Sequence, residues 1–111
     1  MGGKRFDESG LAQDWIHSHE EDTDTTMVFR PAGFRFPPSR GRMGFHLRPG
    51  GKLTARKPGP TDRTEVAAGS WKLSGEQLEL SPRGEDTRIL HVESLEPDRL
   101  VVKKAPSRQV R

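Results

Sequence analysis

Two histidines and several acids stand close together near the start of this 111-residue chain. His17, His19 and Glu21 occupy alternate positions, and alternate side chains of a β-strand point to the same face. A carboxylate beside an imidazole fixes the tautomer of the ring and favours its protonated form, which is what general acid–base catalysis requires. We therefore expect His17 or His19 to act as a base beside the carboxylate of Glu20, Glu21 or Asp22. Of these acids, Glu21 is the one expected to be catalytic.

Arginines follow in residues 39–42, after a turn that two consecutive prolines impose. A guanidinium can stabilise an oxyanion or an enolate, so Arg40 is the expected catalytic helper and Arg42 is expected to contact the ligand. An intramolecular role is the alternative, because guanidinium groups bind carboxylates through two parallel hydrogen bonds. In that case Arg40 or Arg42 forms an ion pair with an acid of residues 20–22 and holds the proline turn over the open end of the barrel.

Two functions of other classes are also open. Two imidazoles and a carboxylate on one strand face are a ligand set for zinc or non-haem iron, so His17, His19 and Glu21 form an alternative metal site. A non-enzymatic module, whose acidic loop and residues 39–42 bind a partner protein, is the other alternative. The chain has no cysteine, which excludes a disulfide framework and a thiolate zinc site. The main hypothesis includes neither a metal nor another cofactor.

The composition is that of one small polar domain. Hydrophobic residues make up 30% and charged residues 32% of the chain, so the core must be thin. The net charge of +3 attracts nucleic acid weakly, but the absence of tyrosine and the 6% of aromatic residues disfavour a nucleic-acid partner. No apolar run approaches the ~20 residues of a membrane span, and no secretion signal opens the chain. We expect a cytoplasmic monomer or homodimer without membrane contact.

Strands must position these side chains, because apolar residues alternate along the chain and turn signals separate the runs. The alternation predicts about eight strands and one short extended segment at residues 34–36. The strands are expected at residues 11–19, 25–30, 42–48, 52–56, 64–73, 77–80, 88–93 and 99–103. Residues 1–10 are predicted to be a flexible lead-in and residues 105–111 a flexible basic tail. One β-barrel domain then covers residues 11–104.

The fold class expected from this pattern is all-β, a small antiparallel up-and-down barrel. Closure into a barrel hides the strand edges, and about eight strands enclose room for side chains or one small ligand. The expected ligand is a small molecule, and a short set of residues is predicted to contact it: Trp15, Trp71, Arg42, Phe45 and His91. For the two tryptophans the alternative is a structural role in the core.

Two resemblances accompany this pattern. Residues 69–80, G-x-W-x-L-x-G-x-x-L-x-L, resemble a hairpin common in small lipocalin-like (calycin) barrels. Residues 15–23, W-x-H-S-H-E-E-D-T, and residues 36–42, F-P-P-S-R-G-R, resemble segments of uncharacterised small bacterial proteins. The first resemblance implies a lipocalin-like fold that binds a small molecule, and a few such proteins are isomerases or cyclases. The resulting hypothesis is binding or processing of a small molecule in a partly polar cavity, with isomerase, cyclase or lyase-type chemistry if the protein is an enzyme.

Overall fold

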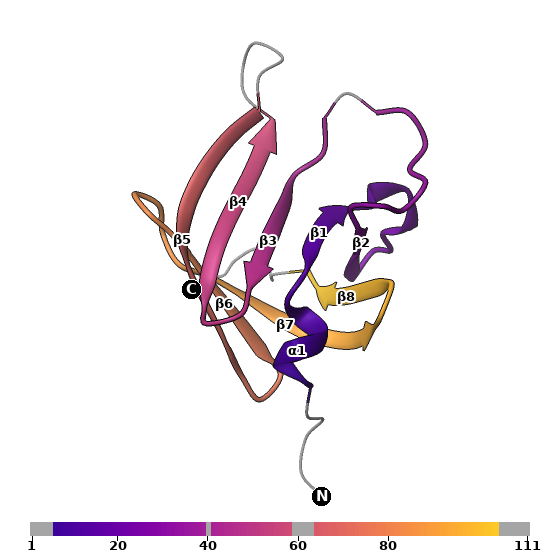
Figure 1. Ribbon diagram of the computed structural model, residues 1–111. Helices are drawn as coiled ribbons and strands as arrows, with labels where there is room; N and C mark the ends of the chain where they lie inside the picture. The colour runs from indigo at the N-terminus through magenta and orange to yellow at the C-terminus, as the bar shows by residue number, and fades with distance from the viewer. Residues whose placement is uncertain (1–5, 40, 59–63, 105–111) are drawn as a thin grey trace, which may run out of the picture.

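The computed structural model of the protein describes residues 6–39, 41–58 and 64–104. Its body is a closed barrel of eight antiparallel strands with a short helix at one end (Figure 1). The strands are β1 (Asp14–His17), β2 (Thr26–Pro31), β3 (Gly44–Arg48), β4 (Lys52–Pro58), β5 (Thr64–Ser74), β6 (Gln77–Pro82), β7 (Arg88–Glu96) and β8 (Arg99–Lys103). The helical segments are α1 (Glu8–Leu11) and the 3₁₀ turn η1 (His19–Glu21). The predicted small eight-stranded antiparallel barrel is confirmed.

The order of strands around the barrel is β1-β2-β8-β7-β6-β5-β4-β3, and β3 closes the ring by pairing with β1. Strands β3 to β8 follow one another as an up-and-down meander. The β1–β2 hairpin lies between the two ends of this meander, with β2 rather than β1 beside β8. Because β1 separates β2 from β3, the connection of residues 32–43 must pass β1 before it enters β3. Figure 1 shows this connection as a long loop.

The inward side chains of the strands form a thin apolar core, as the alternation of strand side chains requires. Its most buried members are Trp15, Phe29, Phe45, Leu11, Leu47, Leu78, Leu100, Val92 and Val102. Both tryptophans belong to this core. The indole Nε1 of Trp15 donates to the carbonyl of Leu11 at 3.0 Å, and that of Trp71 donates to the carbonyl of Arg48 at 2.9 Å. Each buried indole therefore has its hydrogen bond satisfied.

Helix α1 closes one end of the barrel. Leu11 is fully buried, and the next segment is held by Gln13, whose Nε2 donates to the carbonyl of Pro97 in the β7–β8 turn at 3.1 Å. The backbone N–H of Leu47, near the end of β3, donates to the carbonyl of Gln13 at 3.0 Å. Since neighbouring strands are antiparallel, the β1–β2 and β6–β7 connections lie at the opposite end. That end holds the cavity described below.

The predicted first strand, residues 11–19, is too long at both ends. Leu11 is the last residue of α1, because the carboxylate of Asp7 accepts the backbone N–H of Ser9 at 3.0 Å and caps a four-residue helix. A helix this short shows no 3.6-residue period in the sequence. The predicted lead-in of residues 1–10 therefore overlaps a helix over its last three residues. Residues 1–5 and 105–111 lie outside the described part of the chain.

At its other end the predicted first strand gives way to η1. Ser18 is 1% exposed, and its hydroxyl donates to Oε2 of Glu21 at 2.7 Å. This side-chain bond favours a turn over an extended strand. The remaining predicted strands coincide with observed ones to within a few residues, while residues 34–36 are not part of any strand. In the described residues neither helix is long and apolar enough to cross a bilayer.

Candidate functional site

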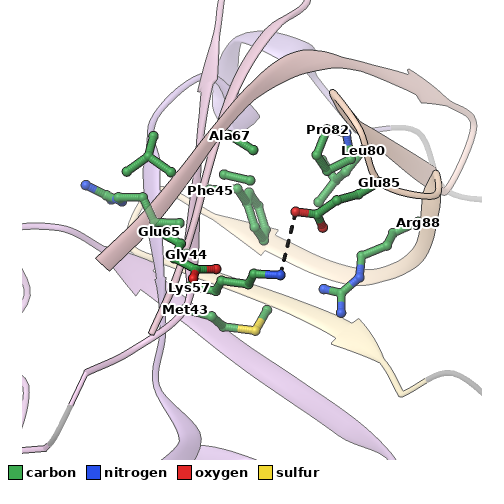
Figure 2. Close-up of a pocket in the computed structure, with 13 residues that line it drawn as sticks. Met43, Gly44, Phe45, Lys57, Glu65, Ala67, Leu80, Pro82, Glu85 and Arg88 are labelled. Atoms are coloured by element: carbon green, nitrogen blue, oxygen red, sulfur yellow. Dashed lines mark ion pairs between the residues drawn. The ribbon is translucent and has the colours of Figure 1, made fainter. Parts of the chain in front are cut away.

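A cavity of about 460 Å³ occupies the barrel interior at the end opposite α1. Its wall is made mostly by inward side chains of β3, β4, β5 and β6, as Figure 2 shows. The apolar lining consists of Met43, Phe45, Ala55, Val66, Ala67, Leu80 and Pro82. Small-molecule sites typically have volumes of roughly 300–1,000 Å³ and mainly apolar walls. This cavity has both properties.

Two alanines that are neighbours on adjacent strands leave this space empty. In the strand register Phe45 lies opposite Ala55, and Ala55 lies opposite Ala67. One layer nearer to α1, Leu47 lies opposite Leu53, and both leucines are almost completely buried. Leucine side chains therefore fill the barrel at the α1 end, and alanines at the equivalent positions leave it open toward the mouth.

Charged residues form the mouth of the cavity. Lys57 ends the inward row of β4, and its Nζ lies 3.6 Å from Oε2 of Glu85 in the β6–β7 turn. Glu65 lies opposite Lys57 in the β4–β5 register. Arg88 begins the inward row of β7, opposite Leu80. The Arg88 guanidinium has no hydrogen-bond or ion-pair partner within residues 6–39, 41–58 and 64–104.

His17 lies next to the cavity wall but does not line it. Its ring packs on Phe29 with 5.2 Å between centroids, and Phe29 packs on Phe45 with 4.9 Å between centroids. Phe45 lines the cavity, so two phenylalanine rings separate the imidazole from it. The His17 Nε2 lies 2.9 Å from Oδ2 of Asp22, whose Oδ1 accepts the backbone N–H of Val28 at 2.9 Å.

The expectation that His17, His19 and Glu21 share a strand face is wrong, because η1 interrupts the alternation after Ser18. His19 is about half exposed and lies 3.3 Å from the hydroxyl of Ser39. Glu21 turns instead to Arg30. The described residues contain no group of three metal-binding side chains suited to an ion. The proposed triad thus does not converge on one point.

Glu21 and Glu20 each bind an arginine through two parallel hydrogen bonds. Arg30 donates to Glu21 from Nη2 at 2.7 Å and from Nε at 2.8 Å. Arg42 donates to Glu20 from Nη2 at 2.6 Å and from Nη1 at 2.9 Å. These bonds lower the pKa of both carboxyl groups to about 2 from an ordinary value of 4.5. They also raise the pKa of both guanidinium groups.

Arg42 therefore has the intramolecular role that was the alternative to ligand contact. It also donates to the carbonyl of His17 at 3.1 Å and to that of Pro37 at 2.7 Å. This joins the proline turn to the end of β1. Arg40, the predicted catalytic helper, lies outside the described residues.

Each of these arginines also covers a phenylalanine. The guanidinium carbon of Arg30 lies 4.6 Å from the ring centroid of Phe34, and that of Arg42 lies 4.8 Å from the centroid of Phe36. The two phenylalanine rings meet edge to face at 5.0 Å. We refer to the trios Glu21–Arg30–Phe34 and Glu20–Arg42–Phe36 as the double clasp. The double clasp holds the β2–β3 connection against β1 and η1.

The other predicted ligand contacts lie away from the cavity. Trp15 and Trp71 are core residues. His91 points outward because its neighbours Leu90 and Val92 occupy the inward row of β7, and its Nε2 lies 2.9 Å from Oε1 of Glu76. Of the residues predicted to contact a ligand, Phe45 lines the cavity.

Sequence reasoning missed the alanines and the charged mouth. The signal was present in the alternation of β4, where Leu53 is followed on the same face by Ala55 and Lys57. Inward side chains that change along a strand from large to small to charged indicate that side chains do not fill that end of the barrel. Reading it required the strand register, which fixes the neighbours of each side chain.

No protein-family model matches the chain, and no curated protein or solved structure matches it. The functional argument therefore depends on the geometry of the cavity itself.

Proposed function

We propose that the protein binds a small, mainly apolar molecule inside the barrel. The observation that carries the proposal is the cavity of about 460 Å³ with a wall of apolar side chains, left open by Ala55 and Ala67. Transfer of apolar surface out of water stabilises a complex by roughly 25 cal/mol per Å². A ligand in this cavity removes from water its own apolar surface and that of the partly exposed lining residues Met43, Ala55 and Ala67.

The resemblance of residues 69–80 to a lipocalin-like hairpin supports the same proposal. It favours a ligand in the barrel interior over a partner on the outer surface. The charged mouth supports it as well, because polar groups at the rim of an apolar cavity orient a ligand that has one polar end.

Binding is favoured over proton-transfer chemistry by the position of the histidines. A general base must come within about 3 Å of the proton that it takes, directly or through one water. His17 is separated from the cavity by Phe29 and Phe45, and its Nε2 is hydrogen-bonded to Asp22. His19 is on the surface beside Ser39. We therefore assign the histidines to the structure of the barrel end.

The test is to fill the cavity. Ala67→Phe puts a ring into the space, whereas Ala68→Phe, one residue later, puts the same ring on the exposed outer face of β5. N-phenyl-1-naphthylamine, an uncharged dye whose fluorescence rises in apolar surroundings, serves as the probe. We expect saturable binding to the parent protein and to Ala68→Phe, and at least roughly ten-fold weaker binding to Ala67→Phe, because the added ring occupies the site.

Thermal unfolding of both variants verifies that each is folded. Equal dye affinity in folded Ala67→Phe and Ala68→Phe contradicts binding in the cavity. Absence of saturable binding to the parent protein, with this dye and with alkyl ligands read by calorimetry, contradicts the proposal as a whole.

A further inference from the structure

We infer that the ligand of the cavity is a monocarboxylate with an apolar body, whose carboxylate binds Arg88. This inference rests on the proposed function and adds the class of ligand to it. It depends on the charges at the mouth, which the binding proposal itself does not require.

Arg88 is placed to meet a ligand that enters the barrel. It holds the first inward position of β7, opposite Leu80, and both residues line the cavity. Figure 2 shows the side chains of Arg88 and Lys57 extending toward one another from opposite sides of the cavity. The guanidinium group therefore stands where the polar end of a bound molecule comes to rest.

The other charges that the structure describes at the mouth are already balanced. Lys57 stands between two acids, since Glu85 lies 3.6 Å from it and Glu65 is its cross-strand neighbour. Arg88 has no ion-pair or hydrogen-bond partner for its guanidinium in the part of the chain that the structure describes. Elsewhere in the protein Arg30 and Arg42 each bind a carboxylate through two hydrogen bonds. Among the described residues Arg88 has no such partner, so its guanidinium is available to a ligand.

The chemistry of the site favours one negative charge. A guanidinium binds a carboxylate through two parallel, charge-assisted hydrogen bonds, and Arg88 is exposed, so a ligand carboxylate can reach it from the mouth. A doubly charged phosphate requires a second cation. Lys57 is engaged by Glu85, and Arg56, which also lines the cavity, is engaged by Asp14. Glu65 and Glu85 repel additional negative charge at the mouth. A monocarboxylate fits these groups better than a phosphate does.

The volume sets the size of the apolar body. A cavity of about 460 Å³ corresponds to roughly 15 volumes of the ~30 Å³ that a water molecule occupies in the liquid. Non-hydrogen atoms of an organic ligand need volumes of similar size. An unbranched carboxylate of medium chain length, such as decanoate, satisfies both the volume and the charge.

The test compares three ligands with the same chain: decanoate, decan-1-ol and decyl phosphate. Each displaces N-phenyl-1-naphthylamine from the parent protein, from Arg88→Gln and from Arg83→Gln. Arg83 is an exposed residue of the β6–β7 turn that does not line the cavity, so it is the matched control. Thermal unfolding confirms that both variants are folded.

We expect the parent protein to bind decanoate roughly ten-fold or more tightly than decan-1-ol, as charge-assisted hydrogen bonds imply. Arg88→Gln should remove this preference and leave the affinity for decan-1-ol unchanged, while Arg83→Gln should behave as the parent protein does. Equal affinity for decanoate and decan-1-ol, or an Arg88→Gln variant that keeps the preference, overturns the inference and leaves the binding proposal intact. Tighter binding of decyl phosphate than of decanoate also overturns it. Failure of the dye and of all three ligands to bind contradicts the proposed function instead.

Discussion

The imidazole Nε2 of His17 lies 2.9 Å from the carboxylate Oδ2 of Asp22. The other oxygen of Asp22 accepts the backbone N–H of Val28 at 2.9 Å, so one carboxylate joins the end of β1 to the beginning of β2. Both side chains are less than one fifth exposed, at 17% and 18%. The histidine ring packs on Phe29 at the same time, which connects this pair to the barrel core. The pair therefore stabilises the β1–β2 hairpin at the end where η1 connects the two strands.

We expect Asp22→Ala to destabilise the protein by about 1–3 kcal/mol, because it leaves the Val28 N–H and the His17 ring without an acceptor. Asp22→Asn keeps an oxygen for Val28 and should cost less. Urea unfolding of the two variants measures the difference. A free energy of unfolding that is equal in Asp22→Ala and the parent protein contradicts the structural role of the pair. The affinity for cavity ligands should stay the same in Asp22→Asn, since Asp22 does not line the cavity.

The pKa values of Glu20 and Glu21 predict how stability depends on pH. Both fall to about 2 in the folded protein because of the hydrogen bonds from Arg42 and Arg30. In the unfolded chain the ordinary value of 4.5 applies. A carboxyl group whose pKa is lower in the folded state binds more protons when the chain is unfolded. The two groups therefore stabilise the protein fully above pH 4.5, and their contribution is lost as the pH falls from 4.5 toward 2.

Melting temperatures recorded between pH 7 and pH 2 test this dependence. The parent protein should lose stability steeply below pH 4.5, and Glu21→Gln should be less stable at pH 7 but lose less on acidification. Asp24→Asn is the matched control, because Asp24 is an exposed acid of the same loop. If Glu21→Gln and Asp24→Asn give parallel curves, the double clasp is not the origin of the acid sensitivity.

The geometry of the double clasp also predicts that lysine cannot replace arginine in it. Arg30→Lys loses the two parallel hydrogen bonds to Glu21 and the planar contact with Phe34, which an ammonium group does not reproduce. We expect a cost of about 1–3 kcal/mol, and about 0.5–1 kcal/mol for Phe34→Leu. Arg35→Lys, at an exposed position of the same connection, should change stability by less than about 0.5 kcal/mol. Urea unfolding measures all three variants, and an Arg30→Lys cost no larger than that of Arg35→Lys contradicts the clasp.

The barrel could be predicted from the sequence because strand burial leaves a direct trace in alternation. In β6, for example, Leu78 and Leu80 are buried while Gln77 is exposed and Glu79 is partly exposed. Each such strand can be predicted from its own residues. The pairing of β2 with β8 cannot be predicted in this way. Either strand of the β1–β2 hairpin can be placed beside β8, and no local pattern in the sequence distinguishes the two orientations.

The candidate site was less predictable for two physical reasons. The hydrogen bonds of η1, among them that from the Ser18 hydroxyl to Glu21, turn the chain after β1. Side chains no longer alternate beyond that point, so the predicted orientation of His19 fails. The cavity depends on the pairing of strands, because Ala55 and Ala67 leave a space only when they are neighbours across β4 and β5. The histidines, acids and arginines clustered in residues 15–42 stabilise the β2–β3 connection. The cavity instead is formed by common residues far apart in the sequence.

The close approach of β5 and β6 beneath the cavity leads to a further prediction. Gly69 follows Ala67 on the inward row of β5 and lies opposite Pro82 in the register with β6. A Cβ atom at Gly69 would lie 2.1 Å from the carbonyl oxygen of Ser81, which is far inside van der Waals contact. The obstacle is backbone, so it cannot move away as a flexible side chain does. The two strands approach this closely because residue 69 has no side chain.

We therefore expect Gly69→Ala to force β5 and β6 apart and to cost about 1–3 kcal/mol, the usual range for overpacking. Gly33→Ala is the control, because a Cβ atom there has no neighbour within 4 Å. Urea unfolding should show a change below about 0.5 kcal/mol for Gly33→Ala. The same displacement alters the wall below Ala67, so Gly69→Ala should also weaken binding of N-phenyl-1-naphthylamine under conditions in which the variant is folded. A Gly69→Ala variant with parental stability and parental dye affinity would mean that the spacing of β5 and β6 does not shape the cavity.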